Sequence, residues 1–232
     1  PSAVTGTAYY YSNAKIMAKC AVMMNEDAAY YEDLAEKIKI SFREKFLNRP
    51  ELEKSQTFIA CCIYQGLYNP EEIPEKAAKL AELVGDNDYR IDCGILGTKY
   101  IFSALADNGY SNVLYKMVTN PKMPSYAYWI NNGMTTFCSS WDMTASRNHH
   151  MFSEVDMWLY KHIAGIKIKG GEITIRPCFI DEVKWVKAKH RDISVYYDME
   201  KITVVVPKKC DVVLGNQVYK VEAGVHTFKI RR

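Results

Sequence analysis

The sequence AGIKIKGGEITI, residues 164–175, separates two kinds of pattern. Isoleucine occupies every second position on each side of Gly170-Gly171, and polar residues fill most of the positions between. Alternation with a period of two around a glycine turn is typical of a β-hairpin. Upstream of Gly165, apolar residues recur at helical spacing instead. The sequence therefore predicts that helices give way to strands at this glycine.

The part before Gly165 predicts alternating amphipathic and more apolar helices. Residues 7–24 and 27–46 each carry apolar side chains along one helical face. Residues 55–66 are apolar on nearly all sides, which is typical of a helix buried in a core. Further helices are expected over residues 74–84, 94–105, 111–118 and 151–164. Such helices with short loops suit the double layer of a helical toroid, and a compact bundle is the alternative.

The part after Gly165 predicts about seven short antiparallel strands separated by turn residues. Short strands at this spacing favour a small β-sandwich. The expected fold class is α+β and multidomain, with part of an (α/α)6 helical toroid before the sandwich. We expect a helical domain over residues 1–165 and a β-sandwich domain over residues 166–232.

The composition excludes several classes of protein. Thirty basic and 27 acidic residues give a formal net charge of +3, too balanced to predict a nucleic-acid surface. No apolar run approaches the roughly 20 residues that span a bilayer. Seven cysteines without a CxxC pair argue against a disulfide framework and against a structural zinc site, and no metal or cofactor is expected. Because the sequence opens without Met, we expect an upstream part, and this end indicates no localisation.

Residues 124–160 concentrate aromatic, amide, hydroxyl and imidazole side chains between predicted helices. Sugar sites need this mixture, because aromatic faces stack on a pyranose and polar groups bond its hydroxyls. Tyr126 and Trp129 are candidates for such contacts, and a core position is the alternative for each. Trp141 and His149 are open between the two roles. Asp142 could equally cap a turn.

Short motifs in this order over nearly the whole chain resemble glycoside hydrolase family 78, the bacterial α-L-rhamnosidases. They are TAYY (7–10), SQT (55–57), GILGT (94–98), PSYAY (124–128), GMTT (133–136), WD (141–142), NH (148–149), WLY (158–160) and AGI (164–166). The resemblance implies the second half of an (α/α)6 toroid followed by the family's C-terminal β-sandwich. It also implies a rhamnosyl glycan as ligand, and His149 matches the family's sugar-contacting His. With it, Tyr126, Trp129, Trp141 and Asn148 are the candidate substrate contacts.

Family members are inverting hydrolases, which need two carboxyl groups roughly 6.5–9.5 Å apart. The resemblance implies that the general acid lies upstream of this chain, and that the general base is the Glu of a Thr-Thr-x-x-Glu-x-Trp motif. Here the motif is TTFCSSW, residues 135–141, and Ser139 occupies the position of the base. A serine hydroxyl alone does not take a proton from water near neutral pH. Asp142 is the least unfavourable substitute, ahead of Glu154 and Asp156.

The sequence thus predicts the C-terminal part of an α-L-rhamnosidase-like glycoside hydrolase that is inactive as given. A non-catalytic carbohydrate-binding protein on the same scaffold is the alternative, and a scaffold without ligand is a third hypothesis. Half a toroid would expose an apolar seam along its first helix, with Tyr9, Tyr10, Ile16 and Met17. We expect that seam to pack against a missing N-terminal part or against a second copy.

Overall fold

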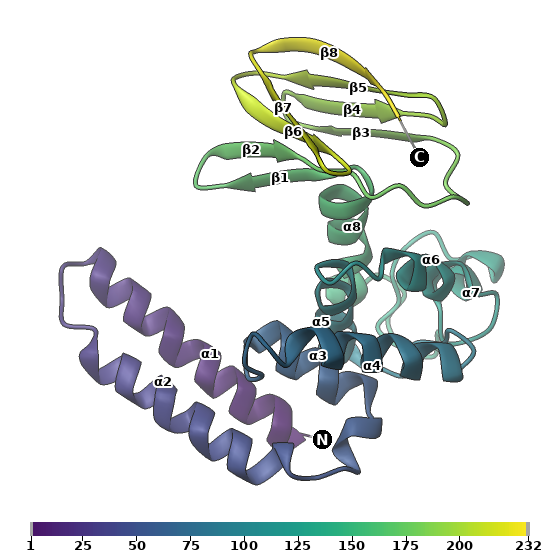
Figure 1. Ribbon diagram of the computed structural model, residues 1–232. Helices are drawn as coiled ribbons and strands as arrows, with labels where there is room; N and C mark the ends of the chain where they lie inside the picture. Colours follow the sequence, from purple (N-terminus) through teal and green to yellow (C-terminus); the bar gives the residue numbers. More distant parts are fainter. Residues whose placement is uncertain (1, 231–232) are drawn as a thin grey trace. The chain divides into compact units, whose positions relative to one another are not determined.

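The computed structural model describes residues 2–230, and these form two compact units that divide between Phe152 and Ser153 (Figure 1). The first unit is helical. The second begins with a short helical stretch and continues as two β-sheets.

The helical unit is built mainly from antiparallel neighbours, as the alternating helical patterns predict. Its elements are α1 (Ser2–Met23), α2 (Ala29–Phe42), a π-helix (Arg43–Leu47), a 3₁₀ turn (Leu52–Lys54), α3 (Gln56–Gln65), α4 (Ile73–Asp86), α5 (Ile95–Ala106), α6 (Ser111–Thr119), α7 (Tyr126–Asn131) and a 3₁₀ turn (His150–Phe152). Helices α1 and α2 lie side by side as a hairpin, and α3 packs against α1, α4 and α5 (Figure 1).

Helices α3 and α5 form the core of this unit because they are apolar on most sides. Phe58, Ile59 and Cys62 of α3 are fully buried, as are Tyr100 and Phe102 of α5. Burial of such side chains stabilises the fold by about 1.5–3 kcal/mol each, before the cost of ordering the chain. The sequence prediction that the third helix lies in a core is confirmed.

Local signals fix the ends of two helices. The Ser55 side chain accepts a hydrogen bond from the backbone N–H of Phe58 and caps α3, and Gly66 ends that helix at φ 73°. Ser125 caps α7 in the same way, through the N–H of Tyr128 at 3.0 Å. Short polar side chains at the first position satisfy N–H groups that have no partner within the helix. The sequence reasoning did not predict α7.

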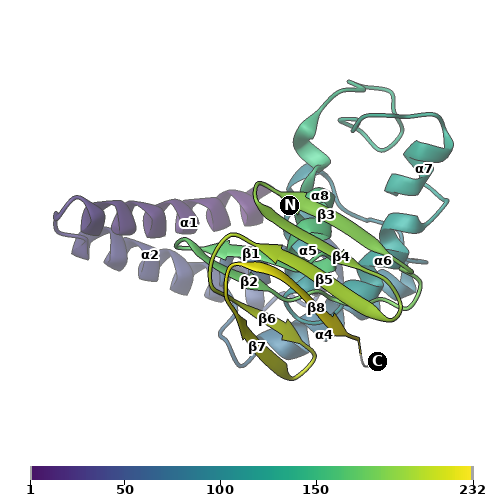
Figure 2. The same ribbon diagram turned by 90° about the horizontal axis from the view of Figure 1, so that it is seen from above.

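The second unit contains a β-sandwich of two four-stranded sheets. Its strands are β1 (Ile166–Lys169), β2 (Glu172–Ile175), β3 (Val186–His190), β4 (Ile193–Tyr197), β5 (Lys201–Val206), β6 (Cys210–Leu214), β7 (Gln217–Val221) and β8 (Gly224–Lys229). One sheet has the order β1-β2-β6-β7 and the other the order β3-β4-β5-β8, and Figure 2 shows the four strands of the latter side by side.

The expected fold class, helices followed by a small β-sandwich, is confirmed, with one difference in strand pairing. Strands β2 and β6 run parallel, with Thr174 opposite Asp211, whereas an entirely antiparallel sandwich was expected. The connection from β2 leads into the other sheet and returns only at β6, so the two strands meet without a hairpin. The inward residues of both sheets, including Ile175, Val195, Val204 and Val212, form one core.

The change from helix to strand falls at Gly165, which has φ 78° and precedes β1 directly. The prediction of a single helix over residues 151–164 is wrong. This stretch is divided into the 3₁₀ turn, α8 (Glu154–Trp158) and a π-helix (Leu159–Ile163). The π-helix packs with the sandwich, where the Tyr197 hydroxyl donates to the Ile163 carbonyl. The compact units therefore divide before α8, and the predicted domain bounds 1–165 and 166–232 stay a prediction.

Within residues 2–230, no helix combines the length and apolar character that crossing a bilayer requires.

Candidate functional site

A cavity of about 660 Å³ in the helical unit brings together segments that are far apart in the sequence. We call it the Ser139 cavity. It is lined by Ser2, Thr5, Thr57, Gly94, Ile95, Leu96, Gly97, Ser139, Ser140, Trp141 and Phe152. The first turns of α1, α3 and α5 thus meet the segment that holds the predicted base position. Three of the motifs that suggested the family, SQT, GILGT and WD, contribute to this wall.

Close packing of α3 against α5 places Thr57 at the cavity. A Cβ atom on Gly97 would lie 2.3 Å from Thr57 Oγ1 and 2.9 Å from the Cβ of Cys93. Real side chains do not tolerate such distances, so only glycine allows the two helices to approach this closely. The sequence reasoning quoted Thr57 and Gly97 as motif residues but did not assign them to the site.

Trp141 anchors the segment that carries Ser139. Its indole Nε1 donates to the carbonyl oxygen of Cys93 at 2.9 Å, just before α5. Its own carbonyl oxygen accepts a hydrogen bond from Nε1 of Trp129, also at 2.9 Å. The two indole rings stack with centroids 4.5 Å apart and an interplanar angle of 26°. Trp141 is half-buried and contributes to the cavity wall. Trp129 is buried, stacks on the Trp141 ring and is not part of this wall.

Tyr126 and Trp129, both predicted as sugar contacts, are buried in an aromatic cluster beneath this segment. The Tyr126 hydroxyl donates to the carbonyl oxygen of Phe152 at 2.6 Å. The Tyr126 ring meets Trp129 edge-on at 5.5 Å and Trp141 edge-on at 5.4 Å. These contacts match the core role that was the alternative for both residues.

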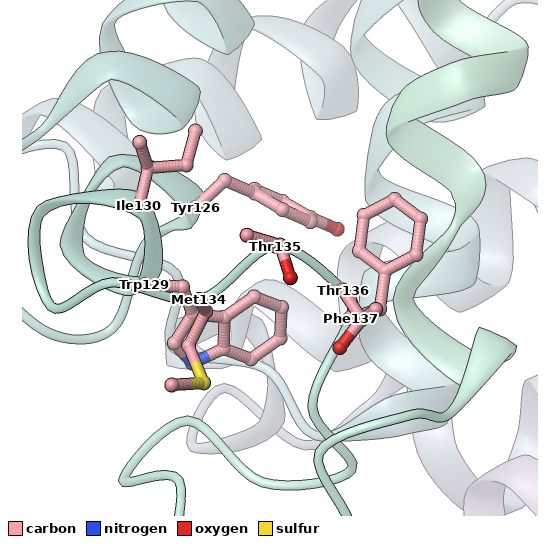
Figure 3. Close-up of a pocket in the computed structure, with 7 residues that line it drawn as sticks. All are labelled: Tyr126, Trp129, Ile130, Met134, Thr135, Thr136 and Phe137. Atoms are coloured by element: carbon pink, nitrogen blue, oxygen red, sulfur yellow. The ribbon is translucent and has the colours of Figure 1, made fainter.

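Tyr126 and Trp129 also line a second, mostly apolar cavity of about 350 Å³, drawn in Figure 3. Its other lining residues are Ile130, Met134, Thr135, Thr136 and Phe137. The Ser139 cavity shares none of these residues.

Ser139 and the residues just before it pair with the chain that returns from the loop. The N–H of Ser139 donates to the carbonyl oxygen of Ser146, and the N–H of His149 donates to that of Phe137, both at 2.8 Å. The Thr136 hydroxyl bonds to the carbonyl oxygen of Arg147. This pairing closes a tight loop and directs Ser139 toward the cavity lining.

Asn148 and His149, the other predicted contacts, lie on the returning chain and are not among the described residues of the cavity wall. Nδ1 of His149 accepts the backbone N–H of Met151 at 3.2 Å, so the neutral ring carries its proton on Nε2. The ring also stacks on that of His150, with centroids 5.4 Å apart. The hydrogen bond from Met151 therefore occupies Nδ1 of His149 and not Nε2.

Asp142, the predicted substitute base, closes its own turn. Its Oδ1 accepts the N–H of Thr144 at 3.2 Å and the hydroxyl of Thr144 at 2.8 Å. The hydrogen bond from the Ser140 side chain, followed by those from Thr144, holds the pKa of this exposed carboxyl below its ordinary value. A lower pKa makes a weaker base, so this environment disfavours proton abstraction by Asp142.

The wall of the Ser139 cavity offers hydroxyls, helix N-termini and an indole but no ionisable side chain among its described residues. Burial raises the pKa of the nearby Cys93 thiol to about 12, so this thiol stays protonated near neutral pH. Glu154 and Asp156 belong to the other compact unit. Over residues 2–230, no cluster of His, Cys, Asp or Glu has the make-up of a metal site.

Helices whose first turns meet at one cavity, followed by a β-sandwich, define the class of proteins that join a helical-hairpin domain to a C-terminal β-domain. The family described as the bacterial α-L-rhamnosidase 6 hairpin glycosidase domain matches residues 1–163, and the chain belongs to this family. The family resemblance seen in the sequence is therefore confirmed.

Relatives and solved structures agree with this assignment. An α-L-rhamnosidase of Streptomyces avermitilis is 29% identical over 193 residues, which cover 76% of this chain and 19% of that protein. The crystal structure of the S. avermitilis enzyme complexed with L-rhamnose has a TM-score of 0.89 at 24% identity and covers 100% of this chain and 27% of that one. The native α-L-rhamnosidase from Aspergillus terreus has a TM-score of 0.87 at 22% identity, over 97% of this chain and 30% of that one. These structural likenesses establish the fold.

Proposed function

We propose that the chain forms one wall of a rhamnosyl-binding site in an α-L-rhamnosidase-like glycoside hydrolase, and that Ser139 occupies the position of the general base. The observation that carries the proposal is the make-up of the Ser139 cavity, which combines hydroxyls, an indole and no carboxylate among its described lining residues. The chain spans 19% of the length of the S. avermitilis relative. Glycoside hydrolase activity of a longer protein that contains this chain is therefore proposed as well.

The lining of the cavity supports recognition of a neutral sugar. The Ser139 hydroxyl can donate to and accept from sugar hydroxyls, whereas the Ser140 hydroxyl already bonds to Asp142 and to the N–H of Ala145, and the Thr57 hydroxyl bonds to Cys93. The Trp141 indole is fixed by its hydrogen bond to Cys93, by stacking on Trp129 and by the Phe152 ring at 4.5 Å, so the part of it that lines the cavity loses little freedom when a sugar binds. The relative in complex with L-rhamnose supports the choice of sugar.

The absence of a base in the cavity wall supports binding without hydrolysis by this chain. General acid and general base catalysis each contribute typically 10²–10⁴ in rate. Ser139 cannot act as the base, and the turn formed around Asp142 makes its carboxylate a weak substitute. These observations also favour the alternative function, a non-catalytic carbohydrate-binding protein on the same scaffold.

Binding is tested by titrating the chain with L-rhamnose and with D-glucose, using calorimetry and tryptophan fluorescence. We expect a dissociation constant for L-rhamnose on the order of 1 mM, as is reasonable for a small polar ligand in an open site. Ser139→Phe should abolish binding by filling the cavity. Thr135→Phe places the same side chain in the second cavity and should leave binding unchanged. Equal responses of the two variants, or equal affinity for D-glucose, would contradict the proposal.

Hydrolysis is tested with p-nitrophenyl α-L-rhamnoside under the conditions that show binding. We expect no release of nitrophenol above a heat-inactivated control. Release that persists after repurification and disappears in Ser139→Phe would show that the cavity is catalytic and would overturn the assignment of Ser139.

A further inference from the structure

The sheet β3-β4-β5-β8 has one face that packs into the sandwich core and one that faces away from it. Val186 and Ala188 of β3 and Val195 of β4 pack in the core. Because side chains alternate along a strand, their neighbours point to the other face. That face carries Trp185, Lys187, Lys189, Tyr196, Lys201, Thr203, Thr227 and Lys229, which we call the lysine–aromatic face, and next to them Ser194 and the exposed pair Val205 and Val225.

Two aromatic side chains are exposed on this face. Trp185, directly before β3, is 65% exposed, and Tyr196 is 41% exposed. Lys187 lies directly opposite Tyr196 in the β3–β4 register. Extending that register by one residue beyond the start of β3 makes Trp185 a diagonal neighbour of Tyr196. Diagonal neighbours in a sheet are about 7–8 Å apart, within reach of large rings. The chain has four tryptophans, and Trp129 and Trp158 are 2% exposed, which makes Trp185 exceptional.

Within residues 2–230, the lysines of this face form no ion pair with a carboxylate, although the charge of Lys201 acts on the nearby Asp198 carboxyl. Lys187, Lys189, Lys201 and Lys229 take part in none of the ion pairs found among the described residues. Lys201 and Lys229 even lie directly opposite each other in the β5–β8 register. Like charges in that arrangement destabilise a sheet, and a bound anion would relieve the repulsion.

Hydroxyls and one carboxylate complete the surroundings. Thr203 lies opposite Tyr196, and its hydroxyl is 3.0 Å from that of Thr227. Asp198, at the edge, is used by the β4–β5 turn, because its Oδ1 accepts the N–H groups of Glu200 and Lys201. The face therefore combines stacking surfaces, hydroxyls and unpaired positive charge.

We propose that the lysine–aromatic face binds an acidic oligosaccharide, with its carboxylates paired to the lysines and a sugar ring stacked on Trp185 and Tyr196. Stacking on exposed aromatic rings suits the apolar face of a pyranose, and four lysines supply the complementary charge for uronate groups. Thr203 and Thr227 offer hydrogen bonds to sugar hydroxyls. Nucleic acid is the competing polyanion for lysines clustered on one face, and decathymidylate is included in the test for this reason.

The proposal is independent of the Ser139 cavity and is tested on the whole chain with hexagalacturonate as the probe. Calorimetry should detect binding that weakens with added salt. Trp185→Ala should lower the affinity about tenfold or more, the order expected for one lost stacking contact, and Trp185→Phe should retain most of it. Thermal melting should be unchanged in both variants because Trp185 is exposed.

A matched pair of variants tests the role of charge. Lys187→Ala/Lys189→Ala should weaken binding and reduce its salt dependence. Lys169→Ala/Lys220→Ala removes the same charge from exposed positions of the other sheet and should have no effect. Ser139→Phe should also have no effect, which separates this proposal from the proposed function.

Four results would overturn the proposal: no binding of hexagalacturonate, equal losses in the two lysine pairs, equal affinity for neutral maltohexaose, or tighter binding of decathymidylate.

Discussion

The indole Nε1 of Trp141 donates a 2.9 Å hydrogen bond to the carbonyl oxygen of Cys93, one residue before the cap of α5. This bond joins the loop that carries Ser139 to the helix start that carries Gly97. Two motifs that are far apart in the sequence therefore form one wall, since the two bonded residues are 48 positions apart. This contact and the backbone pairing of Ser139 with Ser146 together hold residue 139 at the cavity.

Trp141→Phe should keep the stacked ring but lose the indole donor. The Cys93 carbonyl would then lack its partner, which costs about 1–3 kcal/mol in a partly buried site. We expect urea unfolding of the helical unit to shift by that amount and L-rhamnose affinity to fall. Trp185→Phe, at an exposed position, should change stability by less than about 0.5 kcal/mol. Equal unfolding midpoints for the two variants would contradict the anchoring role.

Gly97→Ala should separate α3 from α5. The added methyl group would lie 2.3 Å from Thr57 Oγ1 and 2.9 Å from the Cβ of Cys93, so it would clash on two sides. Overpacking of this kind costs about 1–3 kcal/mol. Gly85→Ala in α4 meets nothing within 4 Å and should stabilise its helix by about 0.5–1 kcal/mol. Thermal unfolding of both variants compares the two signs, and a neutral Gly97→Ala would show that the helices can move apart freely.

Gly165→Ala should destabilise the sandwich unit. Gly165 has φ 78°, and a Cβ there would lie 2.2 Å from backbone atoms of Arg176 and Pro177. The left-handed conformation alone costs about 1–2 kcal/mol, and the clash with rigid backbone adds to it. Gly171→Ala has a similar φ of 84° with its nearest neighbour 3.9 Å away, so it should show only the smaller cost. Near-ultraviolet circular dichroism during denaturation would report both, and similar losses would rule out the steric part.

The fold could be predicted from the sequence where the signal is local, and not where it depends on distant contacts. Isoleucine alternation around Gly170-Gly171 indicated the first hairpin correctly, because pleat and turn are local properties. The parallel pairing of β2 with β6 has no such local signature. Helix α7 was missed because it is only six residues long, although Ser125 is a recognisable cap. The π-helix over Leu159–Ile163 has the same apolar pattern as an α-helix.

The candidate site followed the same division. Ser139 and Trp141 were predicted from a motif, and both line the cavity. Thr57 joins them only because Gly97 lets α3 approach α5, a relationship that spacing along the chain does not reveal. Tyr126 and Trp129 are of residue types that often contact sugars. Their side chains nevertheless donate hydrogen bonds to the carbonyl oxygens of Phe152 and Trp141 within the protein. Whether His149 contacts a ligand stays a prediction.

Glu72→Gln should reduce the stability of the helical unit in a way that depends on pH. Arg43 Nη1 donates to Glu72 Oε2 at 2.9 Å, and the N–H of Asn69 donates to the same oxygen at 2.6 Å. The hydrogen bond from Arg43 is the main cause that lowers the pKa of the Glu72 carboxyl. A lowered pKa in the folded state gives stability that is present above the unfolded pKa, about 4.3, and lost as the pH falls through the folded pKa.

We therefore expect Glu72→Gln to cost about 1–3 kcal/mol at pH 7 and progressively less below pH 4. Glu71→Gln, an exposed neighbour, should change stability by less than about 0.5 kcal/mol at either pH. Urea unfolding at several pH values measures both effects. A loss that is the same at pH 7 and at pH 3 would mean that packing, not the charge, is responsible.

The outer face of α1 should drive self-association of the chain. Tyr10, Ile16 and Met17, predicted to lie on an open seam, are 54%, 53% and 44% exposed. Tyr9, predicted with them, is half-buried, with its ring 6.3 Å from that of Tyr100. Large apolar side chains in such a patch gain about 1.5–3 kcal/mol each when a partner buries them, and each 1.4 kcal/mol is tenfold in affinity.

Sedimentation velocity at rising concentration should reveal a dimer that Ile16→Glu weakens at least about tenfold. Ile168→Glu, at a similarly exposed position of β1, should leave the dimer intact. A chain that stays monomeric at every concentration and does not bind the dye ANS would show that the α1 face needs no partner.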